Sequence, residues 1–305
     1  MSILITGASG FLGRYLVEHL TQTSSEPVIA VSRRDAKLSK GKATWVQADL
    51  ADSKSVSALI AQTKPSQVYH LAGHSRVTST VGMPDYFSAN TLTTFRLVDA
   101  LQRASRPVKF FLASTIHVYG NTEHMASEST PVQPVNDYGF TKYLAEEYLR
   151  KRAQEDSNLT ILIGRLYNCF GPGQAAGFVS ADLCRKIADL PAKGEPVLKV
   201  GPTSTFRRFL DVRDAVPILA RLMALKAPEG FQIINIASPH EVQIRELISL
   251  LLGIAQKKAL IESSEDNSAN RLFGIRVNCD RLTALVPNAQ FRPIQDTLRD
   301  MYASC

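Results

Sequence analysis

The sequence predicts an α/β protein in which a doubly wound parallel sheet is followed by a smaller C-terminal α/β region. Short apolar runs alternate with helical patterns from residue 3 to about residue 163, and this alternation is typical of a parallel sheet. A glycine turn joins the first run to the first helical pattern. The pattern becomes irregular after Arg165, so we expect one domain over residues 1–165. Residues 166–305 would form mainly a second domain, with segments near 209–238 returning to the first sheet.

The composition is that of a globular protein, and it argues against metal, membrane and nucleic-acid partners. Among the 305 residues, no apolar run approaches the ~20 residues of a membrane span, and no signal peptide is visible. The four cysteines are far apart and have no metal-type spacing, which favours a cytoplasmic location. The net charge is +7, but no basic run has interleaved aromatic residues. We therefore expect local pockets for anionic small molecules.

The first strand, Ile3–Thr6, leads into the turn Gly7-Ala8-Ser9-Gly10-Phe11-Leu12-Gly13, and a helical pattern follows. Glycines let the backbone turn sharply and approach a diphosphate, and the helix N-terminus supplies free N–H groups. Strand, glycine turn and helix in this order predict a dinucleotide site. The expected cofactor contacts from this turn are Gly7, Ser9, Gly10, Phe11, Leu12 and Gly13.

The tip of the second strand indicates which dinucleotide is bound. Val28–Ser32 is followed by Arg33 and Arg34, where an NAD-selective protein usually has an acidic residue. A guanidinium suits a ribose 2′-phosphate by charge and by its paired donors, so we favour NADP. Asp35 keeps NAD possible, and a solvated turn is the alternative for the two arginines.

The next strand, Thr44–Gln47, ends at Asp49 and Leu50, and Asp52 is placed to cap the helix that follows through residues 55–62. Gln67–Gly73 is a strand with small residues at its end, which leave room for a ligand. The later elements are expected as a helix over residues 85–101, a strand at Val108–Leu112, a surface loop at Thr122–Asp137, a helix from Tyr138, a strand at Leu159–Ile163, helices near Val179–Ala188, Asp214–Leu225, Val242–Leu252 and Pro293–Tyr302, and an edge strand at Gln232–Asn235.

Tyr138 and Lys142 open the helix after the surface loop. Residues four apart share one face of a helix, so the two side chains should stand together. A free phenol has a pKa near 10 and is a poor acid or base at neutral pH. We expect the ammonium of Lys142 to lower the Tyr138 pKa toward the working pH.

Together these pieces resemble the extended short-chain dehydrogenase/reductase family, whose members mostly modify nucleotide-activated sugars. The motifs that carry the resemblance are Thr6-Gly7-x2-Gly10-x2-Gly13, Asp49-Leu50, His70-Leu71-Ala72, Asn90, Ser114-Thr115 with Val118-Tyr119-Gly120, Tyr138-x3-Lys142, Arg165-x2-Asn168-x2-Gly171-Pro172 and Arg207-Arg208-Phe209-x-Asp211-Val212. The resemblance implies a Rossmann NAD(P)-binding domain, a nucleotide-sugar substrate and a homodimer.

The resemblance also implies roles for individual residues. The catalytic residues would be Thr115, Tyr138 and Lys142. Further cofactor contacts would come from Asp49, Leu50, Leu71, Ala72, Gly73, Asn90, Tyr138, Lys142 and Arg165. The substrate would meet Ser75, Ser114, Thr115, His117, Asn168, Val179 and Arg207, with Arg207 pairing with its diphosphate.

Two stretches, Leu71–Ser75 and Gly171–Val179, resemble the branch of GDP-mannose dehydratases and GDP-6-deoxy-4-ketohexose reductases. The dehydratases have an acidic residue where this chain has His117, which favours a reductase that uses NADPH on a 4-ketohexose. His117 is either a structural histidine within the turn or a second acid/base that epimerises a carbon beside the ketone. The alternatives are a nucleotide-sugar 4-epimerase and an NADP-binding regulator without catalysis.

Overall fold

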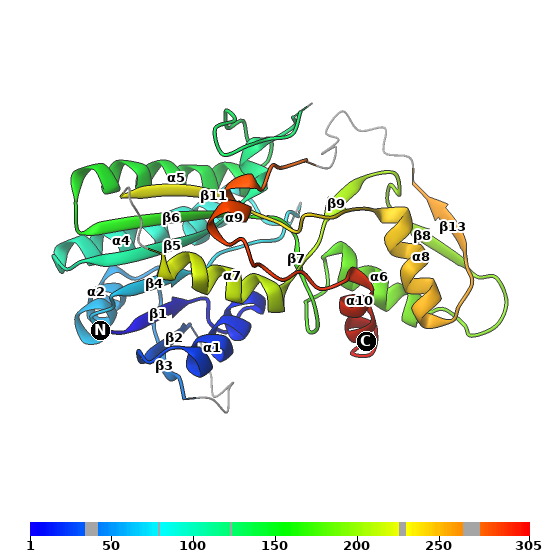
Figure 1. Cartoon of the computed structure of the whole chain (residues 1–305), viewed down its shortest axis with the longest axis horizontal. Helices are drawn as coiled ribbons and strands as arrows, with labels where there is room; N and C mark the ends of the chain where they lie inside the picture. Colours follow the sequence, from blue (N-terminus) through cyan, green and yellow to red (C-terminus); the bar gives the residue numbers. More distant parts are fainter. Residues whose placement is uncertain (34–41, 79, 123, 226–229, 265–274) are drawn as a thin grey trace.

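The computed structural model describes residues 1–33, 42–78, 80–122, 124–225, 230–264 and 275–305. The main sheet within these residues consists of β1 (Ile3–Thr6), β2 (Val28–Ser32), β3 (Thr44–Gln47), β4 (Gln67–His70), β5 (Val108–Thr115), β6 (Leu159–Leu166) and β11 (Phe231–Ile236). The strands are all parallel and lie in the order β11-β6-β5-β4-β1-β2-β3 (Figure 1). This confirms the predicted doubly wound parallel sheet, and it places β11 at the sheet edge.

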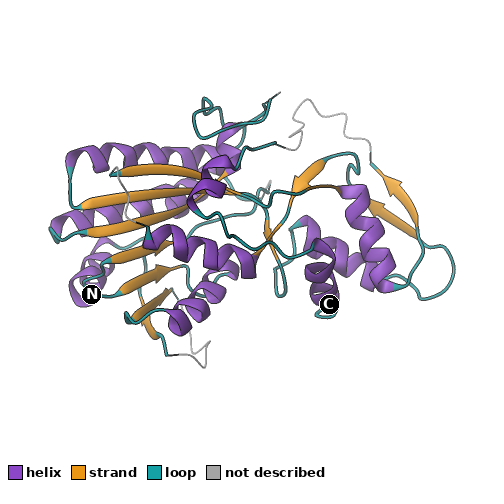
Figure 2. Ribbon diagram, in the orientation of Figure 1, coloured by secondary structure: helices purple, strands orange, loops and turns teal. Residues whose placement is uncertain are grey.

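Helices cover both faces of the sheet (Figure 2). One face packs against α1 (Phe11–Thr23) and α7 (Val212–Ala224), and the other against α2 (Ser53–Thr63), α4 (Thr93–Arg103) and α5 (Asp137–Glu155). Successive side chains of a strand point to opposite faces. In β1, Ile3 and Ile5 join the first core and Leu4 joins the second. The short apolar run is therefore buried on both sides, as expected for a central parallel strand.

The predicted helix over residues 85–101 is wrong in one respect, because it consists of three consecutive segments. They are α3 (Met83–Tyr86), the π-helical turn η1 (Phe87–Leu92) and α4. Pro84 lies in the first turn of α3, where its missing N–H is tolerated. The wide turn contains Asn90, which is fully buried, and π-helical turns are frequent at functional sites.

A second, smaller core lies beyond the carboxyl ends of the strands. It is built from α6 (Val179–Ala188), α8 (Ile244–Ala255) and α10 (Ile294–Tyr302), which lie on the right in Figure 1. Short strand pairs complete it: β8 (Val197–Val200) with β13 (Leu260–Ser263), β9 (Phe206–Arg208) with β12 (Glu241–Gln243), and β7 (Cys169–Phe170) with β10 (Leu210–Asp211). The remaining short helices are η2 (Ile116–Tyr119) and α9 (Asp280–Leu285). Among the described residues, no helix is long and apolar enough to cross a membrane.

Candidate functional site

Two adjoining cavities lie at the carboxyl ends of the central strands, with volumes of about 460 and 430 Å³. We call them the catalytic cavity and the adenosine cavity. Both are lined by Gly7, Gly10, Leu71, Gly73 and His74, so they form one continuous groove. The strand order reverses at β1, which has β2 on one side and β4 on the other. Ligands of open parallel sheets bind at this switch point.

The glycine turn between the cavities has the geometry of a diphosphate site. Gly7 has a φ of +68°, and a Cβ there would lie 2.6 Å from the backbone nitrogen of Ala72. A Cβ on Gly13 would lie 2.2 Å from the carbonyl oxygen of Gly7. Helix α1 begins after Gly10, which has no side chain to cap its free N–H groups. The turn therefore fits a dinucleotide diphosphate at the helix N-terminus.

The adenosine cavity contains most of the residues that were expected to contact the far half of the cofactor. Its lining includes Ser9, Arg33, Asp49, Leu50 and Ala72. Arg34 and Asp35 lie outside the described residues.

Asn90 lines neither cavity and instead fixes the loop after β4. Its Oδ1 accepts a hydrogen bond from the His74 backbone N–H at 2.8 Å, and its Nδ2 donates to the Thr141 hydroxyl at 3.3 Å. A Cβ on Gly73 would lie 2.5 Å from Asn90 Oδ1. Asn90 thus supports Gly73, which lies in the groove itself.

In the catalytic cavity, the Thr115 hydroxyl lies near the Tyr138 phenol. Thr115 is the last residue of β5, and Tyr138 lies in the first turn of α5, where Asn136 caps the helix by accepting from the Gly139 N–H at 2.8 Å. Burial raises the pKa of Tyr138 to about 12, although the nearby Thr115 hydroxyl opposes this shift. The expected lowering by Lys142 is therefore wrong in this structure, because the cost of burying a phenolate dominates.

Lys142 is fully enclosed beside this pair. Its Nζ donates to the backbone carbonyl of Ala113 at 2.9 Å, which holds the ammonium at the end of β5. Burial lowers the pKa of Lys142 to about 8, and the nearby carboxylate of Glu146 opposes the shift. The ammonium form is therefore present at neutral pH but titrates just above it.

Ser114 and Arg165 both interact with the buried carboxylate of Glu146. The Ser114 hydroxyl donates to Glu146, and Arg165 forms an ion pair with it at 2.6 Å. The exposed fraction is 1% for Arg165 and 0% for Glu146. Arg165 lines neither cavity, so the expected cofactor contact is not found. Its guanidinium lies instead over the Tyr119 ring, 4.7 Å from the centroid.

His117 lines the catalytic cavity next to Tyr138, with a centroid distance of 5.7 Å between the two rings. Burial, aided by the positive charge of Arg207, lowers the pKa of His117 to about 4. His117 is therefore neutral at neutral pH. Its Nδ1 lies 3.5 Å from the side-chain nitrogen of Asn136, the residue that caps α5.

The other expected substrate contacts are divided between the lining and its surroundings. Ser75, Asn168 and Val179 line the catalytic cavity, whereas Arg207 does not. Asn168 has a φ of +34°, a left-handed conformation that asparagine tolerates better than most residues. The positive charge of Arg207 lowers the pKa of His117 and opposes the raised pKa of Tyr167.

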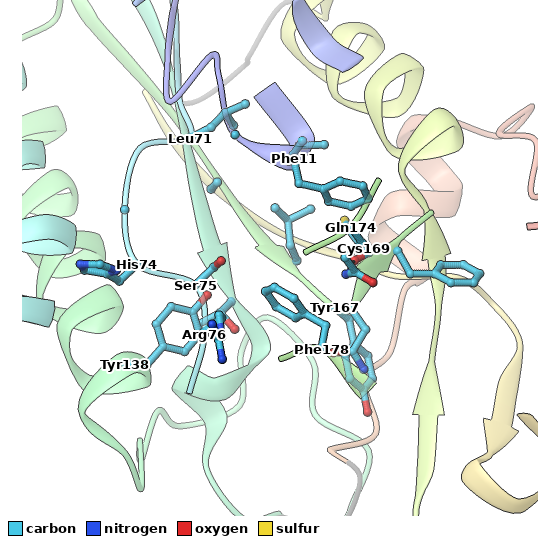
Figure 3. Close-up of a pocket in the computed structure, with 18 of the residues that line it drawn as sticks. Phe11, Leu71, His74, Ser75, Arg76, Tyr138, Tyr167, Cys169, Gln174 and Phe178 are labelled. Atoms are coloured by element: carbon cyan, nitrogen blue, oxygen red, sulfur yellow. The ribbon is translucent and has the colours of Figure 1, made fainter. Parts of the chain in front are cut away.

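The structure adds lining residues that the sequence reasoning missed. They are Arg76, Tyr167, Cys169, Gln174 and Phe178. In Figure 3, Arg76 lies beside Tyr138, whereas Tyr167, Cys169 and Gln174 lie across the cavity. Glycine spacing was the signal for some of them, because Gly171, Gly173 and Gly177 frame the loop that carries Gln174 and Phe178. No pattern singled out Arg76.

Comparisons with known proteins agree with this geometry. The sequence model of the NAD dependent epimerase/dehydratase family matches residues 3–237. GDP-6-deoxy-D-mannose reductase of Pseudomonas aeruginosa is 32% identical over 260 residues, covering 83% of this chain and 80% of that protein. Human GDP-mannose 4,6 dehydratase is 26% identical over 287 residues, covering 88% and 76% respectively.

Solved structures give the same result. The structure of RMD from Pseudomonas aeruginosa complexed with NADPH is 27% identical, with a TM-score of 0.82 over 100% of this chain and 97% of that chain. MoeE5 in complex with UDP-glucuronic acid and NAD is 25% identical, with a TM-score of 0.85 over 100% and 98%. The groove, its glycine turn and these matches assign a nicotinamide dinucleotide, NAD or NADP, as the cofactor. The chain belongs to the NAD-dependent epimerase/dehydratase family, whose members modify nucleotide sugars.

Proposed function

We propose that the protein reduces the C4 ketone of a nucleotide-activated 6-deoxy-4-ketohexose, most favourably a GDP-linked one, at the expense of NADPH. The observation that carries this proposal is the placement of the Thr115 hydroxyl near the Tyr138 phenol in the lining of one cavity. The raised pKa of Tyr138 keeps its proton in place at neutral pH. A ketone that receives a hydride must also receive a proton, and this phenol holds one at the end of β5.

Bound NADPH supplies the hydride. Thr115 would donate a hydrogen bond to the ketone oxygen and so stabilise the negative charge that develops there. Tyr138 would transfer its phenolic proton to the same oxygen as the alkoxide forms. The ammonium of Lys142 would stabilise the phenolate left behind, and its bond to Ala113 keeps it in place.

The choice of NADPH rests on the adenosine cavity. Arg33 lines it, and a guanidinium binds a 2′-phosphate with two parallel hydrogen bonds. Asp49 also lines this cavity, but its Oδ1 accepts from the Ala51 N–H at 2.9 Å. The NADPH complex of the similar Pseudomonas protein supports the same choice. The preference for NADPH is tested by measuring kcat/KM for NADPH and for NADH in wild type and in Arg33→Ala, which should lose the preference.

The choice of reductase over dehydratase rests on the absence of a carboxylate. Among the described residues that line the catalytic cavity, none is Asp or Glu. Removing a carbon-bound proton beside a ketone needs a base, and His117, with a pKa of about 4, is a weak one. The 32% identity to a GDP-6-deoxy-D-mannose reductase supports the same choice.

A nucleotide-sugar 4-epimerase is the second candidate, because similar structures hold UDP-sugars together with NAD. An epimerase oxidises and re-reduces its substrate with no net redox change. To distinguish the two activities, purified protein is mixed with NADPH and a panel of nucleotide ketosugars. We expect NADPH absorbance to fall with a ketosugar. Turnover of a saturated nucleotide hexose, without NADPH loss on any ketosugar, would establish the epimerase. A non-catalytic regulator is disfavoured because Tyr138 and Lys142 are both in place.

We further propose a homodimer that pairs through the outer faces of α4 and α5. Phe95 of α4 and Tyr148 of α5 stack with centroids 3.8 Å apart, which fixes the two helices as one surface. Light scattering at micromolar concentration is expected to give twice the mass of the 33.5 kDa chain.

A further inference from the structure

Two loops meet at the mouth of the catalytic cavity, and Arg76 makes the contact between them. Arg76 belongs to the loop after β4, and Gly177 belongs to the loop before α6. A Cβ on Gly177 would lie 2.2 Å from Arg76 Nη2 and 2.4 Å from its Cζ. Gly177 has a φ of +90°, which also favours glycine. The missing side chain at residue 177 is therefore the space that the guanidinium occupies.

A second arginine, Arg14, also packs against a glycine of the loop before α6, but its guanidinium donates hydrogen bonds to that loop. Arg14 Nη2 donates to the carbonyl oxygens of Pro172 and Gly173, at 3.1 and 2.8 Å. Its Nη2 would lie 2.2 Å from a Cβ on Gly173. Arg14 does not line the catalytic cavity. Its guanidinium therefore holds the loop from outside.

Arg76 differs from Arg14 in having donors to spare. Its guanidinium makes no hydrogen bond or ion pair with any residue that the structure describes, and the residue is exposed. It does line the catalytic cavity, whose described lining has no carboxylate. The other cation there, Lys142, is buried and bound to Ala113. Within the described lining, Arg76 is thus an accessible cation, and no carboxylate there would repel an anionic ligand.

The backbone of Arg76 is fixed relative to the catalytic phenol. The Tyr86 hydroxyl donates to the Arg76 carbonyl oxygen at 2.5 Å, and the Tyr86 ring packs against Tyr138 with centroids 6.2 Å apart. Figure 3 shows Arg76 and Ser75 on the same side of the cavity as Tyr138, facing Phe178. A ligand held by Arg76 would therefore reach Thr115 and Tyr138.

We propose that Arg76 is a substrate-binding residue that holds anionic oxygens of the nucleotide sugar between these two loops. The inference rests on the proposed function in that the ligand is taken to be a nucleotide sugar. A guanidinium can bind the paired oxygens of either a phosphate or a carboxylate with two parallel hydrogen bonds. The ligand group is therefore the substrate diphosphate or a carboxylate on the sugar, and the experiment separates the two.

The experiment measures the affinity of the full-length protein, with NADP present, for GDP, GDP-mannose, UDP-glucose and UDP-glucuronate by calorimetry. Arg76→Gln is expected to weaken binding of the ligands that wild type binds by roughly tenfold, the effect of losing a charge-assisted pair. Equal losses for UDP-glucose and UDP-glucuronate assign the diphosphate, whereas a larger loss for UDP-glucuronate assigns a sugar carboxylate. Arg14→Gln removes the same charge beside the same loop and is expected to stay within about twofold of wild type.

Gly177→Ala provides an independent route to the same site. The added methyl group would displace the Arg76 guanidinium, so affinity should fall in the same direction. The double variant with Arg76→Gln should then bind no more weakly than Arg76→Gln alone, because the two changes act on one contact. The inference is overturned if Arg76→Gln binds every ligand within twofold of wild type. If wild type itself binds none of the four ligands, the proposed function fails together with the inference.

Discussion

The hydroxyl of Ser114 donates to the buried carboxylate of Glu146, whereas the adjacent hydroxyl of Thr115 lies near the phenol of Tyr138. Both residues lie at the end of β5, and successive side chains of a strand point to opposite faces. Both residues line the catalytic cavity, but the Ser114 hydroxyl is bonded to Glu146, whereas the Thr115 hydroxyl lies near Tyr138. Glu146, four residues after Lys142 in α5, accepts from Ser114 and also forms the ion pair with Arg165.

This separation predicts different effects for two neighbouring substitutions. Thr115→Val should lower kcat by about 10²–10³, the usual loss when a donor to a developing oxyanion is removed. Ser114→Ala should lower kcat by less than about tenfold and reduce stability by about 1–2 kcal/mol, because Glu146 keeps its ion pair with Arg165. Steady-state kinetics with a nucleotide 4-ketosugar, together with denaturant unfolding, measures both. Equal kinetic losses for the two variants would contradict the assignment.

A pH dependence follows from the titration of Lys142. Its pKa is lowered to about 8, so the ammonium is lost as the pH rises through that value. We expect kcat/KM for NADPH, which reports the free enzyme, to fall above about pH 8. Glu146 raises the Lys142 pKa, so Glu146→Gln should move this midpoint to lower pH.

The control for Glu146→Gln is Glu147→Gln. Glu147 is adjacent in the chain but half-exposed, and it pairs with Arg150 at 3.2 Å. Exposed pairs contribute little, so the midpoint of this variant should equal that of wild type. A midpoint that does not move in Glu146→Gln would show that the carboxylate does not act on Lys142. Its loss would then affect only stability, where breaking a buried pair costs about 3–5 kcal/mol.

Much of the fold was predictable because its signals are local. The glycine turn is visible because Gly7 and Gly13 occupy positions where any side chain would collide with backbone. The central strands are visible because they are buried on both faces. Tyr138 was indicated by its spacing from Lys142 and Thr115 by a family resemblance, and in the structure both line the same cavity.

The remaining features depend on contacts that no local pattern encodes. Glu146 resembles an ordinary polar helix residue, and only tertiary packing places it against Arg165, with an exposed fraction of 0%. Arg76 and Gly177 are a hundred positions apart and meet only when the loops do. The Tyr138 pKa was misjudged because spacing showed the nearby ammonium but not the burial of the phenol, which has the larger effect. The division at residue 165 stays a prediction.

The first glycine turn gives a prediction about cofactor binding. Gly13→Ala places a Cβ 2.2 Å from the Gly7 carbonyl oxygen, so the turn must shift at a cost of about 1–3 kcal/mol. NADP at 100 times its Kd should stabilise wild type by about 2.7 kcal/mol, and this gain should vanish in the variant. Thermal unfolding with and without NADP measures it.

Gly253→Ala is the matched control for the glycine turn. Gly253 lies in α8 with no atom within 4 Å of an added Cβ. This substitution should stabilise the protein by about 0.5–1 kcal/mol, because alanine favours a helix more than glycine does, and it should keep the full response to NADP. If NADP stabilised Gly13→Ala as much as wild type, the assignment of the cofactor diphosphate to this turn would be contradicted.

His117 gives a prediction about hydrogen exchange. Its pKa of about 4 makes it neutral between pH 6 and 8, and it should not remove a proton from the carbons beside the ketone. Turnover in D₂O should therefore give a product with no more deuterium at C3 or C5 than the ketosugar acquires without protein. Deuterium above that level, lost in His117→Asn, would identify His117 as an epimerising base.

The central claim is that Thr115 and Tyr138 serve a ketone reduction at C4. The most direct measurement uses NADPH with deuterium at both C4 positions, together with a GDP-linked 6-deoxy-4-ketohexose, and locates the label in the product by NMR. We predict one deuterium at the former carbonyl carbon, one NADPH consumed per product, and a loss of at least about 10²-fold in rate for Tyr138→Phe. A product without deuterium at C4, or wild-type rates in Tyr138→Phe, would contradict the account.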